Sequence, residues 1–260
     1  MDRREPKILL VDDDELSRRM MELLLTGEGY NYDTASNGKE AISSLQSQSF
    51  DIVLMDLQMP IMDGFEATRK IRAWESGSGH TPIVALSAML MEDEIQNCLS
   101  AGMDGCIEKP FNTEQLFQLI ESYVSQSTQP ISSGKSQEIK RTDELMVLDI
   151  QSALPRFGKS LRAYQDFLKE FMNELPGRID QFRTMFLSGN YHALADYAHN
   201  LKGISANMGA VQLSHLSHVL DETSQGGDSL KIQQSLDDIN KHVHVLQKVA
   251  TEFLSGYLQQ

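Results

Sequence analysis

The sequence predicts two domains of different fold class, a doubly wound α/β domain with a five-stranded parallel sheet and then an all-α helical bundle. Across residues 1–124, short apolar runs alternate five times with segments of helical periodicity, which is the pattern of five βα units. Across residues 145–260 no further strand pattern occurs, and apolar residues recur at helical spacing. Residues 125–144 are dominated by Ser, Gln, Thr, Pro and Gly, so we expect a flexible linker there.

The strands of the first domain are expected where apolar residues cluster. The run Ile52–Met55 is continuous rather than alternating, which indicates a strand buried on both faces of a parallel sheet. We expect the helices that follow these strands to begin at polar N-cap residues, such as Asp14 and Asn37. In the helix that begins at Asp63-Gly64, we expect Trp74 to be an apolar anchor. The expected strands are Lys7–Val11, Tyr30–Ala35, Ile52–Met55, Pro82–Leu86 and Gly105–Glu108.

The second domain is predicted to be an up-down helical bundle. Pro176 lies inside its first long helical segment and predicts a kink or a break there, because proline removes a helix hydrogen bond. A shorter helix is expected over Asp149–Phe157. The long segments are Leu161–Phe186, Tyr191–Met208, Val211–Thr223 and Leu230–Leu258.

The acidic residues are concentrated in the first domain. Residues 1–124 hold 22 Asp and Glu against 10 Lys and Arg, a net charge of −12, whereas residues 125–260 hold 15 against 13, a net charge of −2. Neither half has the basic surface that nucleic-acid binding requires. The two cysteines are too few for a disulfide framework. The sequence has no apolar run long enough to span a membrane and no signal peptide. We therefore expect a cytoplasmic chain.

Polar residues follow four of the expected strands. Asp12 and Asp13 follow the first, Asp56 the third, Ser87 the fourth and Lys109 the fifth. The carboxyl ends of parallel strands meet at one sheet edge, so these side chains can converge. Three carboxylates repel one another unless a hard cation such as Mg²⁺ neutralises them. Together with a lysine and a hydroxyl they suit phosphoryl chemistry, in which one carboxylate can be the nucleophile.

The motifs around these residues resemble those of bacterial response-regulator receiver domains, which have a flavodoxin-like fold. The resemblance covers about residues 6–124. It implies that Asp56 is the phosphoacceptor, that Asp13, Asp56 and the Gln58 carbonyl bind Mg²⁺ directly, and that Asp12 binds it through water. The matching motifs are Ile8-Leu9-Leu10-Val11-Asp12-Asp13, Met55-Asp56-Leu57-Gln58-Met59-Pro60-Ile61-Met62-Asp63-Gly64, Leu86-Ser87-Ala88 and Lys109-Pro110-Phe111.

The same resemblance implies roles for the fourth and fifth strand ends. Ser87 and Lys109 would contact phosphoryl oxygens, and the Lys109–Pro110 peptide bond would be cis. One position departs from the family pattern. Receivers commonly have an aromatic switch residue three positions before the lysine, where this chain has Cys106. The usual coupling of a Ser or Thr to that aromatic ring is therefore in doubt.

A histidine in the second domain is predicted to stand apart from the apolar stripe of its helix. His199 lies about 200° around the helix axis from Leu201, so we expect it to face solvent. Its helical neighbours Ala195, Gly203 and Ala206 are small, and Lys202 supplies a nearby cation. An exposed imidazole with these neighbours can accept a phosphoryl group. The apolar stripe consists of Leu194, Ala198, Leu201, Ile204, Ser205 and Met208.

The stretch Ala198-His199-Asn200-Leu201-Lys202-Gly203 resembles histidine phosphotransfer domains, which are built around a four-helix bundle. The resemblance implies that His199 is phosphorylated, that Lys202 assists and that Gly203 leaves room for a docking receiver. The chain is then a phosphorelay protein that moves a phosphoryl group between Asp56 and His199, with a sensor histidine kinase and other receivers as partners.

Alternatives remain open from the sequence. The order of the two domains is typical of the C-terminal end of hybrid sensor histidine kinases, although this chain has no Gly-rich ATP loop, so it is a stand-alone relay protein or a portion of such a kinase. Asp12-Asp13-Asp14 would also suit an Asp-nucleophile phosphatase, which leaves Asp56 unexplained. Cys106 is compatible with a phosphorylation-independent interaction module.

Overall fold

A computed structural model describes residues 6–75, 79–87, 92–109, 111, 113–124 and 147–256. The chain divides into two compact units, an α/β unit and a helical unit, which are described separately. The expected linker over residues 125–144 and the expected cis Lys109–Pro110 bond lie outside the described residues. No helix in the described ranges combines the length and the apolar character needed to cross a membrane.

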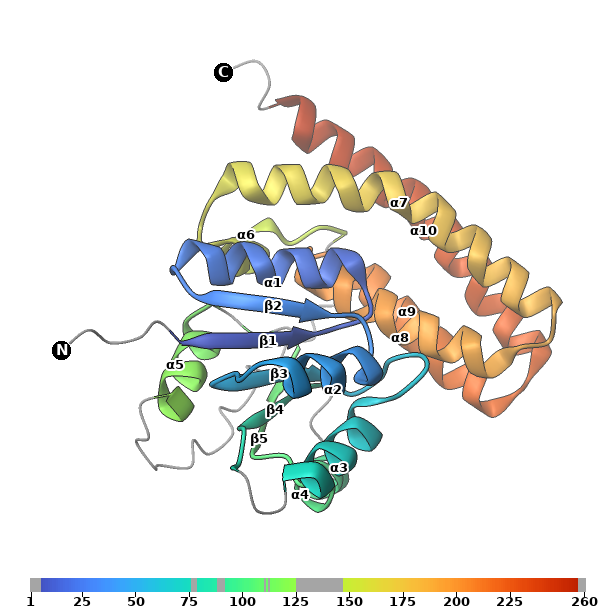
Figure 1. The fold of residues 1–260 in the computed structure, drawn as a ribbon. Coiled ribbons are helices and arrows are strands. Elements are labelled where there is room, and N and C mark those ends of the chain that lie inside the picture. Colours follow the sequence, from blue (N-terminus) through green and yellow to red (C-terminus); the bar gives the residue numbers. More distant parts are fainter. Residues whose placement is uncertain are drawn as a thin grey trace. The chain divides into compact units, whose positions relative to one another are not determined.

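The first unit contains a five-stranded sheet in the order β2-β1-β3-β4-β5, and all of its neighbouring strands are parallel (Figure 1). This confirms the predicted fold class and each predicted strand to within one residue at its ends. The chain moves from β1 outward to β2 and then crosses to β3 on the other side of β1. Such a switch point opens a crevice at the carboxyl ends of β1 and β3. The strands are β1 Lys7–Val11, β2 Asn31–Ala35, β3 Ile52–Asp56, β4 Ile83–Ser87 and β5 Gly105–Glu108.

Helices cover both faces of the sheet and enclose two apolar cores. Residues of α1 and α5 pack with one set of inward strand side chains, and residues of α2, α3 and α4 pack with the other set. The predicted caps are confirmed, since Asp14 accepts from the Ser17 amide at 2.9 Å and Asn37 from the Glu40 amide at 3.0 Å. The helices are α1 Glu15–Gly27, α2 Gly38–Ser47, α3 Gly64–Glu75, α4 Glu92–Ala101 and α5 Thr113–Val124.

Trp74 is not the apolar anchor that the helical spacing predicted. Its side chain is 49% exposed, whereas Ile71 on the same helix is buried. Trp74 lies one position before the end of α3, and the apolar stripe of that helix is already completed by Ala67 and Ile71. The prediction was wrong because helical spacing alone does not show which positions in the last turn of a helix are covered by neighbouring elements.

The second unit is helical throughout its described elements, as predicted. Its long helix α7 is continuous through Pro176. Figure 1 shows α7 changing direction part-way along its length, so of the predicted kink or break the structure has a kink. A bend is expected there because proline has no backbone N–H and so removes one helix hydrogen bond. The elements are α6 Ile150–Ala153, the 3-10 helix η1 Leu154–Phe157, α7 Leu161–Leu187, α8 Tyr191–Asn207, α9 Val211–Gly226 and α10 Ser229–Gly256.

The turn between α8 and α9 is held by residues of the segment that runs from Asp149 into the first turn of α7. Gly209 has a φ of +75°, and a Cβ at that position would lie 2.3 Å from the carbonyl oxygen of Asp149. The Asp149 amide donates to the Gly209 carbonyl at 2.7 Å. Arg156 donates to the Ala206 carbonyl at 3.1 Å and the Tyr164 hydroxyl to the Met208 carbonyl at 3.0 Å. The last turn of α8 therefore finds hydrogen-bond donors outside its own helix.

Candidate functional site

A cluster of three carboxylates lies at the carboxyl end of the sheet in the first unit. Asp12 and Asp13 follow β1, Asp56 ends β3, and one oxygen from each lies within 4.8 Å of the others. The parallel register Val11 to Met55 brings these strand ends side by side. Asp12 is buried, and its carboxylate accepts from the Ser17 hydroxyl at 2.9 Å and the Asp14 amide at 3.0 Å. The structure thus brings together the acidic residues that the sequence singled out.

Lys109 reaches this cluster from the end of β5. Its Nζ lies 2.9 Å from Asp12 Oδ2 and 2.5 Å from Asp56 Oδ2, and its side chain is 10% exposed. The other oxygen of Asp56 accepts from the Gln58 amide at 3.1 Å. Asp56 is therefore held at both oxygens, by an ammonium at one and by a backbone amide at the other. A half-buried carboxylate fixed in this way is oriented before any reaction takes place.

Burial and charge shift the acid–base equilibria of the cluster. Burial raises the pKa of Asp13 to about 7, and repulsion from Asp12, Asp56 and Asp14 adds to the increase. Burial also raises the pKa of Asp56, an effect that Lys109 opposes. Burial lowers the pKa of Lys109, but Asp12 and Asp56 outweigh it and raise the pKa above its usual value, so the amine stays charged. One ammonium among three carboxylates leaves an excess of negative charge.

The donor set fits a hard divalent cation. Asp12, Asp13 and Asp56 offer carboxylate oxygens within the span of one coordination sphere, and Gln58 is an exposed residue two positions after Asp56. Oxygen ligands of this kind suit Mg²⁺ rather than a softer metal. A divalent charge would also remove the repulsion that raises the pKa of Asp13. The chemistry of these residues is therefore compatible with the ion expected from the sequence.

Ser87 lies at the same sheet edge, but its hydroxyl is oriented toward α4. It ends β4, one residue beyond Leu86, which is the register partner of Asp56. The buried hydroxyl donates to Glu94 Oε2 at 2.9 Å. The structure therefore confirms the position expected for Ser87, while its predicted contact with a phosphoryl oxygen requires the hydroxyl to turn away from Glu94.

Cys106 belongs to the core of the first unit. It is in register with Ala85 on β4 and packs as a half-buried side chain with the cluster that includes Cys98 of α4. Burial raises the pKa of the Cys106 thiol, with Glu94 adding to the effect. The thiol is therefore a packing group rather than a reactive one.

His199 lies on α8 and faces the seam with α9. Its Nδ1 lies 3.1 Å from Asp221 Oδ2, and its side chain is 21% exposed. The prediction that the ring faces solvent was therefore wrong in degree, because spacing along α8 takes no account of what α9 places beside it. Ala195, expected on an open surface, is buried. The predicted apolar stripe of α8 is confirmed, since all of its members are buried.

Asp221 is the functional candidate that sequence reasoning missed. Its carboxylate is buried, and its second oxygen accepts from Gln225 Nε2 at 2.6 Å. A carboxylate at Nδ1 favours the tautomer that carries its proton there and leaves the lone pair on Nε2. One signal was available in the sequence, because Asp221 follows Leu213 and Ser217 at four-residue spacing, on the face that α9 buries. An acidic residue on such a face needs a partner.

Lys202 and Gly203 lie one turn beyond His199. A Cβ at Gly203 would have no heavy atom within 4 Å, so the surface there is low, as the sequence predicted. Burial lowers the pKa of His218 on α9, and the Lys202 ammonium lowers it further. The Lys202 carbonyl also accepts from the Ser214 hydroxyl at 3.0 Å.

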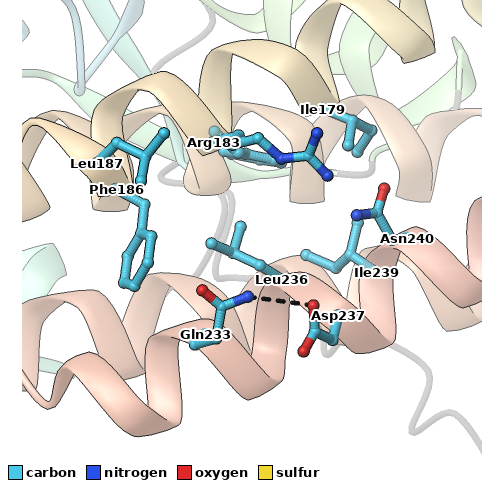
Figure 2. Close-up of a pocket in the computed structure, with 10 residues that line it drawn as sticks. Ile179, Arg183, Phe186, Leu187, Gln233, Leu236, Asp237, Ile239 and Asn240 are labelled. Atoms are coloured by element: carbon cyan, nitrogen blue, oxygen red, sulfur yellow. Dashed lines mark hydrogen bonds between the residues drawn. The ribbon is translucent and has the colours of Figure 1, made fainter.

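A separate hollow of about 150 Å³ lies between α7 and α10 and is lined by apolar and polar side chains of both helices (Figure 2). Its residues include Phe186 and Leu236, and none of the predicted site residues lines it. Asp56 and His199 instead lie at the carboxyl end of the sheet and at the seam between α8 and α9.

Comparison with known families identifies both units. Residues 8–121 match the response regulator receiver domain, and residues 166–251 match the Hpt domain. The chain is a receiver domain followed by a histidine phosphotransfer domain. It therefore belongs to the phosphorelay class of two-component signalling proteins, as its motifs predicted.

Relatives of this receiver–phosphotransfer chain are longer proteins. The sensor histidine kinase GacS of Pseudomonas protegens is 30% identical over 254 residues, which are 96% of this chain and 27% of that protein. The sensor protein EvgS of Escherichia coli is 27% identical over 95% of this chain and 19% of that protein. Among solved structures, the receiver domain of sensor histidine kinase PA1611 from Pseudomonas aeruginosa is 35% identical, with 47% of this chain and 99% of that chain covered and a TM-score of 0.44.

Proposed function

We propose that this chain accepts a phosphoryl group on Asp56 and on His199 and passes it between these residues or to partner proteins. One observation carries the proposal. Each domain presents a nucleophile held by a buried charged partner, with Lys109 at 2.5 Å from Asp56 and Asp221 at 3.1 Å from His199. Both partners orient the nucleophile; Lys109 can also balance the charge of the phosphoryl oxygens, and Asp221 the positive charge that the imidazole acquires.

In the receiver domain, an oxygen of Asp56 attacks the phosphorus of the donor. The new oxygen–phosphorus bond forms as the bond from phosphorus to the donor breaks, and the donor leaves with that electron pair. Lys109 keeps its charge near the phosphoryl oxygens, and Ser87 offers them a hydrogen bond once its hydroxyl leaves Glu94. Asp12, Asp13, Asp56 and the Gln58 carbonyl would hold Mg²⁺, which when bound offsets the charge of the carboxylates and the phosphoryl oxygens.

In the phosphotransfer domain, Nε2 of His199 attacks the phosphorus of an aspartyl phosphate. The nitrogen–phosphorus bond forms as the bond to the aspartate oxygen breaks, and the aspartate regains its carboxylate. Asp221 keeps the proton on Nδ1 and compensates the positive charge that the ring acquires. Lys202 lies one turn away, at the distance from which an ammonium can attract phosphoryl oxygens.

The test is to label the protein with radioactive acetyl phosphate and Mg²⁺ and to examine the stability of the label. An acyl phosphate on Asp56 is lost in alkali, and a phosphoramidate on His199 is lost in acid but survives alkali. Wild type is expected to carry both kinds. Asp56→Asn should carry neither, since the phosphoryl group enters through the receiver, and His199→Gln should keep only the alkali-labile label. A label stable to acid and alkali would indicate Ser, Thr or Tyr and would refute the proposal.

A sensor histidine kinase as phosphoryl donor and a further receiver as acceptor are the partners we propose. The similarity to GacS and EvgS supports a second form of the same function, in which this chain is a portion of a hybrid sensor kinase. The two forms differ in the donor. Rapid labelling of Asp56 by the kinase core of the same polypeptide, with slow labelling by separate kinases, would favour the hybrid form.

A further inference from the structure

A carboxylate lies on the inward face of α4, the face that packs against the sheet. Glu94 is half-buried and precedes the buried residues Cys98 and Ala101 by four and seven positions. Residues at this spacing share one face of a helix. Asp93, in the same helical turn, is exposed. An acidic group on an inward face needs a hydrogen-bond donor, because burial otherwise disfavours its charge.

Ser87 is a donor to this carboxylate. Its hydroxyl donates to Glu94 Oε2 at 2.9 Å, and the serine is 3% exposed. An ionised acceptor makes such a hydrogen bond stronger than one between neutral groups. The backbone of Ser87 is held separately, since it ends β4 and its carbonyl accepts from the Lys109 amide at 2.5 Å. The hydroxyl therefore changes partner by rotation of the side chain, without movement of the strand.

The position of Ser87 places a second acceptor beside it whenever Asp56 is phosphorylated. Ser87 directly follows Leu86, which is the register partner of Asp56 in the sheet. A serine hydroxyl has one proton to donate. While that proton is donated to Glu94, the hydroxyl cannot donate to an oxygen of a phosphoryl group. The carboxylate on α4 and the phosphoryl group therefore compete for one hydrogen bond.

We propose that Glu94 is a positioning residue that restrains phosphorylation of Asp56 by holding the Ser87 hydroxyl in a hydrogen bond to α4. The proposal rests on the proposed function, in which Ser87 binds phosphoryl oxygens. When the phosphoryl group arrives, Ser87 exchanges one charged acceptor for another, and the half-buried carboxylate of Glu94 loses its donor. This loss offsets the gain, so the hydroxyl assists phosphorylation less than it would beside an apolar residue.

The charge of Glu94 alone predicts a similar effect, so a test has to separate charge from competition. Removal of a negative charge near the sheet edge would speed reaction with an anionic donor, whatever the partner of Ser87. Asp93→Asn is the matched control for charge, because Asp93 is an exposed acidic residue in the same first turn of α4. Ser87→Ala is the control for competition, because it removes the proton for which the two acceptors compete.

The experiment measures the rate at which acetyl phosphate and Mg²⁺ label Asp56 in the full chain with His199→Gln, which keeps the label on the receiver. Glu94→Leu should be labelled roughly tenfold faster, the effect of one hydrogen bond to a charged acceptor. Glu94→Gln should show a smaller increase, since its amide oxygen still accepts from Ser87. Asp93→Asn should keep the parent rate. In a Ser87→Ala background, both Glu94 variants should be labelled at the rate of Ser87→Ala alone.

Two results would overturn the proposal. Labelling of Glu94→Leu and Glu94→Gln at the parent rate would show that the carboxylate does not restrain Ser87. An equal increase with and without the Ser87 hydroxyl would show that Glu94 acts through its charge. Should Glu94→Leu not fold, Glu94→Gln decides the question by the same comparison. Failure of the proposed function looks different, because wild-type protein would then take no alkali-labile label at all.

Discussion

The two proposed phosphoacceptor sites differ in how their side chains are held. Asp56 lies at the end of a parallel strand, where residues from three strand ends converge and Lys109 contacts two carboxylates at once. His199 lies on a helix surface, where one residue of the neighbouring helix, Asp221, fixes its ring. The sheet edge builds a dense cluster of charges that fits a metal ion. The helix seam supplies one hydrogen bond, between Asp221 and Nδ1 of the His199 ring. The first site is thus arranged to stabilise charge, and the second to present a nucleophile.

The largest effect is expected from removal of the cation at the sheet edge. Lys109→Met should lower the rate of Asp56 labelling by acetyl phosphate by about 100-fold or more, since one preorganised charge near a reacting oxyanion is worth that much. The rate is measured with Mg²⁺ present throughout. Lys70→Met is the control, because Lys70 forms an exposed salt bridge with Glu66 on α3. An undiminished rate in Lys109→Met would show that the strand-end cluster does not depend on its lysine.

Removal of the metal ion tests the role of the carboxylates in the same cluster. Labelling of wild-type protein should require Mg²⁺ and stop on addition of excess chelator, and Asp13→Asn should respond weakly to Mg²⁺ because one ligand is missing. Binding of Mg²⁺ is measured by calorimetry beside the labelling assay. The metal assignment fails if Asp13→Asn and wild type are labelled equally with no Mg²⁺ in the solution.

A smaller effect is expected at the helix seam. Asp221→Asn should slow phosphoryl transfer to His199 by roughly 10- to 100-fold, the usual effect of removing the group that orients a reactive histidine. Nitrogen NMR of the imidazole gives a readout that a packing defect would not produce, namely a shift of the proton from Nδ1 toward Nε2. Asp237→Asn is the control, because its exposed carboxylate accepts from Gln233 in the hollow of Figure 2. An unchanged tautomer would refute the role given to Asp221.

The smallest effect concerns acid stability of the helical unit. Burial lowers the pKa of His242, whose Nε2 is buried without a hydrogen-bond partner in the described structure. Below pH 6.5, the ordinary pKa of histidine, His242 binds a proton in the unfolded chain but not in the folded chain. The free energy of unfolding therefore falls as the pH falls. For one proton, the free energy of unfolding cannot change by more than about 1.4 kcal/mol per pH unit.

Urea unfolding followed by helical circular dichroism at pH 7.5, 6.5 and 5.5 measures this slope. His242→Phe should flatten it, whereas the same change at His244 should not, because His244 is an exposed residue two positions further along α10. Equal slopes in wild type and His242→Phe would assign the acid sensitivity to other groups.

The contrast between the two sites also shows what could be predicted from the sequence. Strand ends of a parallel sheet meet at one edge whatever the details of packing, so order along the chain was enough to bring Asp12, Asp56 and Lys109 together. A helix seam depends on the rotation and offset of two helices, which periodicity does not give. Asp221 was therefore missed, and His199 was expected to be more exposed than it is.

Backbone strain is a further property that composition and periodicity do not predict. The motif around Ile61 matches the receiver family, but nothing in its spacing indicates a positive φ at a β-branched residue. The turn is imposed by Met62 and Gly64, whose contacts lie on other segments of the fold. The same limit applies to Trp74, since its exposure depends on which elements pack against the last turn of α3.

The hydrogen bonds that close the end of α8 affect where the phosphotransfer domain can be cut for separate study. The family match begins at residue 166, yet the carbonyls of Ala206, Met208 and Gly209 accept from Arg156, Tyr164 and Asp149. A fragment that starts at residue 166 keeps His199 but leaves three carbonyls without their donors, less than three helical turns beyond it. The smallest fragment with a native phosphoacceptor helix therefore starts before Asp149.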